Sequence, residues 1–132
     1  MERPVVSEMQ EMLGTFNGKN FVNTDGKEYP IPQNYVSKSM LVEGDNLKLI
    51  ITSDFEMKYK QIKPVERKKS MAKIMLKPDD NKLCAYSGGK YYSIQPASIS
   101  FYQLEVGDDC IIILPKNNPD TLYCAIEHKM NI

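Results

Sequence analysis

Two segments of the chain share one pattern of apolar and polar positions. Residues 26–52 and 89–115 align without a gap at an offset of 63 residues, and nine of the 27 aligned positions are identical. Each segment holds a Gly-Asp pair, at 44–45 and 107–108, with apolar stretches on both sides. This match predicts an internal repeat in which copy one spans 13–63 and copy two spans 76–127.

Within each copy the pattern predicts short strands and one short helix. Asn23-Thr24-Asp25-Gly26 in copy one and Ser87-Gly88-Gly89 in copy two are turn signals of the kind that join two strands of a hairpin. A short helix or an irregular crossover is expected at 33–40, and its counterpart is expected at 97–103. Strands are expected at 21–22, 29–31, 47–52 and 57–62 in copy one, and at 110–114 and 122–126 in copy two.

The two Gly-Asp pairs are expected to be structural turns. Gly44 and Gly107 can adopt the positive φ that other residues resist. Asp45 and Asp108 can then accept hydrogen bonds from nearby backbone N–H groups and close the turn.

The apolar runs that follow these turns indicate a barrel. Residues 110–114 are almost continuously apolar, which is typical of strands covered on both faces. A copy of about 50 residues is too small to bury an apolar face alone. We therefore predict an all-β fold with short helices, in which two tandem ββαββ-like repeats form one pseudo-twofold closed β-barrel within a single domain, 1–132.

Two further segments lie outside the repeats. Residues 1–14 predict a short N-terminal helix, with Ser7 as its cap and Gly14 as its end. Its Met9 and Met12 either pack on one end of the barrel or bind a partner. Residues 64–75 are expected to be a basic linker between the copies.

Three stretches of copy one resemble the AbrB-like, or transition-state regulator, family of cradle-loop barrels. They are Tyr29-Pro30-Ile31-Pro32, the segment from Leu41 to Leu47 (LVEGDNL) and Tyr59-Lys60-Gln61-Ile62. The resemblance implies swapped hairpins closing one barrel, DNA binding and transcription regulation. Copy two departs from the family pattern at Ile94-Gln95-Pro96, and the DNA-contacting arginines of the family are missing near the first strand.

Charge is unevenly distributed along a chain whose formal net charge is zero. Residues 58–77 hold eight basic residues and one acid, Glu66, a pattern that attracts phosphate. Three interpretations remain open: a solvated linker, a nucleic-acid contact with base stacking on a tyrosine, and a site for an acidic protein. The candidate nucleic-acid contacts are Lys58, Tyr59, Lys60, Lys63, Arg67, Lys68, Lys69, Lys73 and Lys77.

The residues that carry catalysis or metal binding are scarce in this sequence. Cys84, Cys110 and Cys124 lack the spacing of a zinc site, and His128 is the single histidine. No catalytic or phosphate-loop motif is present. We therefore expect a non-enzymatic, cytoplasmic protein without a cofactor, a metal or a membrane partner, present as a monomer or homodimer.

Two functions are compatible with these features. The first is a nucleic-acid-binding module, either a DNA-binding regulator or a factor associated with RNA or ribosomes, which uses the basic segment 58–77. The second is a protein-interaction module that uses the methionine-rich N-terminal helix and the barrel surface. Ligand sensing by the barrel loops is a weaker third hypothesis, because no specific recognition residues support it.

Overall fold

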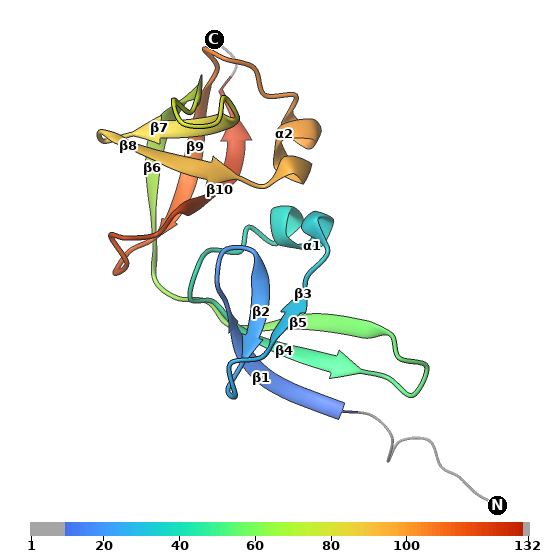
Figure 1. Ribbon diagram of the computed structural model, residues 1–132. Helices are drawn as coiled ribbons and strands as arrows, with labels where there is room; N and C mark the ends of the chain where they lie inside the picture. Colours follow the sequence, from blue (N-terminus) through green and yellow to red (C-terminus); the bar gives the residue numbers. More distant parts are fainter. Residues whose placement is uncertain (1–9, 131–132) are drawn as a thin grey trace, which may run out of the picture.

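The protein is mostly β-structure and consists of two halves arranged one above the other (Figure 1). The computed structural model describes residues 10–130. The first half runs to the end of strand β5 at Lys63, and the second half begins with strand β6 at Arg67. Both halves have the same order of elements, three strands followed by a short helix and two more strands.

The first half is an open five-stranded sheet with the strand order β3-β2-β1-β4-β5. All of its paired strands are antiparallel. Its elements are β1 (Gln10–Phe16), β2 (Asn20–Asn23), β3 (Glu28–Pro30), α1 (Gln33–Lys38), β4 (Asn46–Ile51) and β5 (Met57–Lys63).

The second half is a closed five-stranded barrel in which β8 meets β10 in parallel and the other pairs are antiparallel. Its strand order matches that of the first sheet, with β6 in the place of β1. Its elements are β6 (Arg67–Leu76), β7 (Leu83–Ser87), β8 (Lys90–Ile94), α2 (Pro96–Tyr102), β9 (Asp109–Pro115) and β10 (Tyr123–Lys129).

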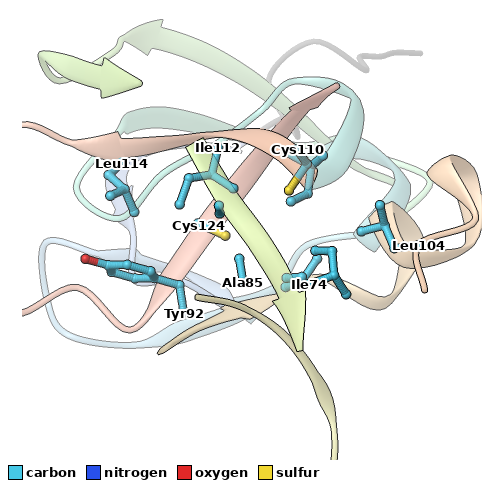
Figure 2. Packing of buried hydrophobic residues seen from close by; sticks show 11 residues of the cluster. Ile74, Ala85, Tyr92, Leu104, Cys110, Ile112, Leu114 and Cys124 are labelled. Atoms are coloured by element: carbon cyan, nitrogen blue, oxygen red, sulfur yellow. The ribbon is translucent and has the colours of Figure 1, made fainter. Parts of the chain in front are cut away.

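Each half has a hydrophobic core of its own. Ile74, Cys110, Ile112 and Cys124 point into the barrel from neighbouring strands, and all four side chains are buried (Figure 2). The first half buries a separate cluster around Phe21. The prediction of a β-rich fold with a closed barrel and two short helices is confirmed, whereas the prediction of one barrel shared by the two copies is wrong. Copy two closes a barrel by itself.

The two halves differ in one backbone donor at the point where the barrel closes. The Ser93 N–H donates to the Leu122 carbonyl oxygen over 2.8 Å where β8 meets β10. The aligned residue in copy one is Pro30, which has no N–H to donate. There the Tyr59 hydroxyl on β5 donates instead to the Pro30 carbonyl oxygen on β3.

The two Gly-Asp turns have the same backbone geometry in both halves. Gly44 has φ +99° and Gly107 has φ +96°, where a side chain would be strained. The Gly44 N–H donates to the Phe16 carbonyl oxygen over 2.7 Å, and the Gly107 N–H donates to that of Ile74 over 2.8 Å. Asp45 and Asp108 each accept from the backbone N–H three residues earlier, as a structural turn requires.

Two segments differ from the expected structure because both form strands. Residues 10–14 belong to β1, so the expected helix is wrong there, and its remainder lies outside the described residues together with Met9. Residues 67–75 belong to β6 and not to a linker. On β6 the small residues Ser70 and Ala72 point inward and alternate with the outward Lys69 and Lys73. Because the inward residues are small and the outward ones charged, the sequence was interpreted as a linker and not as a strand.

Residues of both halves meet in a small interface. Val42 of the first half packs with Ile113 and Ala125 on the outside of the barrel, and all three are buried. Direct hydrogen bonds also cross between the halves, including Ser37 Oγ to Ser98 Oγ at 2.6 Å. The two halves are therefore packed against one another and not merely joined by the chain.

Candidate nucleic-acid interface

The basic segment 58–77 does not form one surface patch. It is extended through β5 and β6, and a strand advances by about 3.3 Å per residue. The segment therefore runs from the first half into the second (Figure 1). Lys58 and Lys60 are exposed on β5, Lys68 borders a hollow of about 280 Å³ beside the β7–β8 turn, and Lys77 lines a cleft between the halves.

Arg67 is a structural residue, which corrects its prediction as a nucleic-acid contact. Its guanidinium binds both carboxylate oxygens of Asp45, at 2.8 and 2.6 Å, and also donates to the carbonyl oxygens of Met40 and Val65. Asp45 is fully buried. A guanidinium so occupied is not available to a phosphate.

Tyr59 is also placed differently from its prediction as a stacking residue. Its ring packs inside the first half against Phe21 and Tyr35, at centroid distances of 5.7 and 6.2 Å. Burial, reinforced by Tyr29, raises the pKa of the Tyr59 hydroxyl to about 12. The ring is partly buried in this aromatic cluster, where its role is structural.

Two lysines of β6 have acidic neighbours on the barrel surface. Lys69 lies 2.6 Å from Glu127, and Lys73 lies 3.0 Å from Asp109. Both lysine side chains are more than half exposed. Such exposed pairs are weak, with a median near 0–1 kcal/mol, so a phosphate can compete for these lysines.

Other lysines gather on the outer face of β4 and β5. Lys48 stands directly opposite Lys60, and Lys58 stands opposite Ile50. Glu11 is the acid that pairs with Lys48, at 3.4 Å. Like charges opposite one another destabilise a sheet, yet lysines on an edge strand also prevent pairing with other chains. This group therefore has a structural explanation as well as a functional one.

A different surface combines aromatic rings with positive charge. Tyr86 on β7 stands opposite Lys73 on β6 and opposite Tyr91 on β8, so the three side chains form one row on the outside of the barrel. The two rings lie 4.9 Å apart, and each tyrosine is more than a third exposed. Together with Met71, which is 59% exposed, we call these residues the tyrosine face.

The tyrosine face continues along the same strands towards the first half. Two residues further along, Cys84 stands opposite Ser93, and Ser93 stands opposite Tyr123. Beyond them, the Lys77 N–H donates to the Lys82 carbonyl oxygen over 2.8 Å. Alternate residues of a strand share one face. The same strand face therefore leads from the row of tyrosines, past the buried Cys84, to a cleft edged by lysines.

The sequence contained a signal for this tyrosine pair. A two-residue turn at Gly88-Gly89 fixes the hairpin register and places Tyr86 directly across from Tyr91. The distribution of charge along the sequence indicated Tyr59 and not these two residues. Charge does not show which residues of a hairpin stand opposite one another.

The remaining candidate groups have structural roles. Met12 lies half-buried on β1 and packs against the first core, so it is not free to bind a partner. Burial raises the pKa of Cys110 to about 11 and raises that of Cys124 as well, and both thiols are buried. Within residues 10–130, no group of three or more His, Cys, Asp or Glu side chains is arranged to hold a metal ion.

Comparisons with models of known protein families, with characterised proteins and with solved structures gave no match for this chain. The AbrB-like resemblance therefore stays a prediction, and a function has to be inferred from the geometry of the surface. In the part of the chain that the structure describes, no helix is long and apolar enough to cross a membrane.

Proposed function

We propose that the chain is a non-enzymatic module that binds single-stranded nucleic acid on the tyrosine face. The observation that carries the proposal is the row formed by Lys73, Tyr86 and Tyr91 on three neighbouring strands. Bases stack on exposed aromatic rings, at about 1–3 kcal/mol per base, while lysines attract the phosphates. This chemistry is sequence-tolerant, because every base presents a π-face.

A single strand fits this surface better than a duplex does. Bases within a duplex are stacked on one another, so surface tyrosines can reach only unpaired bases. Lys73 lies on β6, and Lys77 and Lys82 face one another just beyond the paired ends of β6 and β7, so positive charge accompanies a strand that runs from the tyrosines to this end. DNA and RNA strands share these features, and transcription regulation or ribosome association would each supply such a strand.

The test measures fluorescence anisotropy of labelled oligo-dT, oligo-U and duplex DNA with the full chain at several salt concentrations. We expect the single strands to bind more tightly than the duplex, with an affinity that falls as salt rises. Tyr86→Ala and Tyr91→Ala should each weaken binding about five- to hundredfold, and Tyr→Phe should restore it.

Matched variants decide between the two lysine surfaces. Lys58→Glu/Lys60→Glu changes the outer face of β5 and should leave most of the affinity, whereas Lys73→Glu should remove much of it. Equal binding by wild type and the Tyr86→Ala/Tyr91→Ala double variant would overturn the assignment of the surface. The absence of binding to every oligonucleotide at low salt would overturn the function.

A groove between the two helices favours protein binding as a second candidate. It has a volume of about 430 Å³ and is lined by Met40, Ala97, Phe101 and Tyr102 among others. Phe101 is 76% exposed, as in a surface that a partner covers. A partner recovered after nuclease treatment by wild type but not by Phe101→Ala would support this function; capture unchanged by Phe101→Ala would count against it.

A further inference from the structure

A cleft of about 600 Å³ lies between the two halves. Lys19 and Ile31 line it from the first half, and Lys82, Ile94 and Tyr123 line it from the second. Its volume is within the range of about 300–1,000 Å³ that is usual for small-molecule sites. Such sites are common where two structural units meet.

Equivalent residues of the two copies face one another across this cleft. At the offset of 63 residues, Lys19 aligns with Lys82 and Ile31 aligns with Ile94, and all four line the cleft. Both halves thus contribute the turn after their first strand and the isoleucine that precedes their helix. The cleft therefore has one isoleucine and one equivalent lysine from each half.

The cleft has an excess of positive charge. Lys19, Lys77 and Lys82 line it together with one carboxylate, Asp80. Asp80 Oδ1 accepts the backbone N–H of Lys82 at 3.0 Å. Among residues 10–130 none of these three lysines forms an ion pair, in contrast to Lys69 on the barrel surface. A ligand with about two negative charges would balance the cleft.

The uncharged lining suits a planar group with hydrogen-bonding edges. Ile31, Ile94 and Tyr123 supply an apolar and aromatic wall. The amide of Asn20 donates to Glu28 Oε1 at 2.9 Å, and that of Gln95 donates to the Gly18 carbonyl oxygen at 2.7 Å. Both amides keep a side-chain oxygen that can accept from a ligand.

The two walls are fixed relative to one another before any ligand arrives. The bond from Gln95 to Gly18 bridges the halves at the edge of the cleft. Gly18 has φ +103° and lies so close to Tyr123 that an added Cβ would be 2.7 Å from the ring. This close approach sets Lys19 beside the aromatic wall. Preorganised sites lose less entropy when they bind.

We propose that this cleft binds a nucleotide, with its phosphate held by Lys19, Lys77 and Lys82 and its base against the wall formed by Ile31, Ile94 and Tyr123. The phosphate supplies the two negative charges, and the base supplies an aromatic plane with donors and acceptors. A free nucleotide and the 5′-phosphorylated end of a strand share this chemistry. The cleft shares Lys77 and Lys82 with the path of a strand beyond the tyrosine face, but nucleotide binding there does not need Tyr86 or Tyr91.

Isothermal titration calorimetry of the full chain at low salt tests this site with AMP, ATP, inorganic phosphate and a short oligonucleotide with or without a 5′-phosphate. We expect a nucleotide to bind more tightly than inorganic phosphate. Lys19→Ala and Lys82→Ala should each weaken binding about fivefold, and the double variant more, whereas Lys116→Ala, at an exposed lysine outside the cleft, should have no effect.

Each outcome has a defined meaning. Binding of free nucleotides supports the site. In the Tyr86→Ala/Tyr91→Ala variant, binding of the oligonucleotide only when it carries a 5′-phosphate also supports the site and identifies a strand end as the source of the ligand. Inorganic phosphate binding as tightly as nucleotides, affinity unchanged by both lysine variants, or no binding by any probe would overturn it. The Tyr86→Ala/Tyr91→Ala variant should still bind AMP normally, so failure of the strand-binding function is distinguishable from failure of the cleft.

Discussion

The ion pair between Asp45 and Arg67 offers a quantitative test of the corrected role of Arg67. The carboxylate of Asp45 is fully buried and accepts hydrogen bonds from Arg67, from the backbone N–H groups of Val42 and Val65 and from the Gln61 amide. Replacing Arg67 by methionine keeps much of its stem and removes the charge that neutralises Asp45.

The structure sets the expected magnitude. Removing one partner of a buried ion pair costs about 3–5 kcal/mol, because the other charge is left without compensation. The Arg67 side chain is 24% exposed, and three neutral donors to Asp45 remain. We therefore expect Arg67→Met to lower the free energy of unfolding by about 3 kcal/mol, at the lower end of that range.

Urea unfolding followed by circular dichroism measures this loss. The second copy supplies a matched control, because Asp108 is the aligned aspartate and pairs with Lys129 at 3.3 Å. Both side chains of that pair reach solvent, so Lys129→Met should change stability far less than Arg67→Met. A loss below about 1 kcal/mol for Arg67→Met, or equal losses for both variants, would refute the reasoning.

Three further predictions concern groups that the structure places in the two cores or at the closure of the barrel. Ser93→Pro should cost about 3 kcal/mol in thermal or urea unfolding because it removes the N–H that closes the barrel, whereas Pro30→Ser should change stability little; equal effects would contradict this explanation. Tyr59→Phe removes the hydrogen bond to the Pro30 carbonyl oxygen, so it should lower the free energy of unfolding by about 1 kcal/mol and leave oligonucleotide binding unchanged. Weaker binding would show that Tyr59 contacts the nucleic acid. Burial raises the pKa of Cys110 from 9.0 to about 11, so the folded state holds this proton more tightly than the unfolded chain; stability should fall as pH rises from about 9 towards 11, and less steeply in Cys110→Ala.

Local pattern predicted much of the secondary structure. The turns at Asn23–Gly26 and Ser87–Gly89, both helices and the strands after each Gly-Asp pair agree with the structure. The first strand of each half was missed for a different reason. Part of β1 resembles the end of a capped helix, and β6 alternates lysine and methionine with small residues, which resembles a linker in composition. Where the barrel closes, Ser93 donates a backbone N–H that the aligned Pro30 lacks, and the apolar pattern does not report this difference.

The interface was harder to predict because charge in the sequence and charge on the surface differ. The segment 58–77 is strongly basic, yet the charge of Arg67 is neutralised by the buried Asp45, which lies 22 residues away in the chain. Long-range partners of this kind have no local signal. The tyrosine pair, in contrast, could have been predicted locally, because the two-residue turn at Gly88-Gly89 sets the register that places Tyr86 opposite Tyr91.

Backbone amide chemical shifts of the ¹⁵N-labelled chain, recorded while a single-stranded oligonucleotide is added, test the central proposal most directly. We predict that the largest changes lie at 71–75 and 84–93, which include the tyrosine face, while residues 58–63 of β5 change little. Largest changes on β5 with Tyr86 and Tyr91 unaffected, or no changes anywhere at low salt, would contradict the proposal.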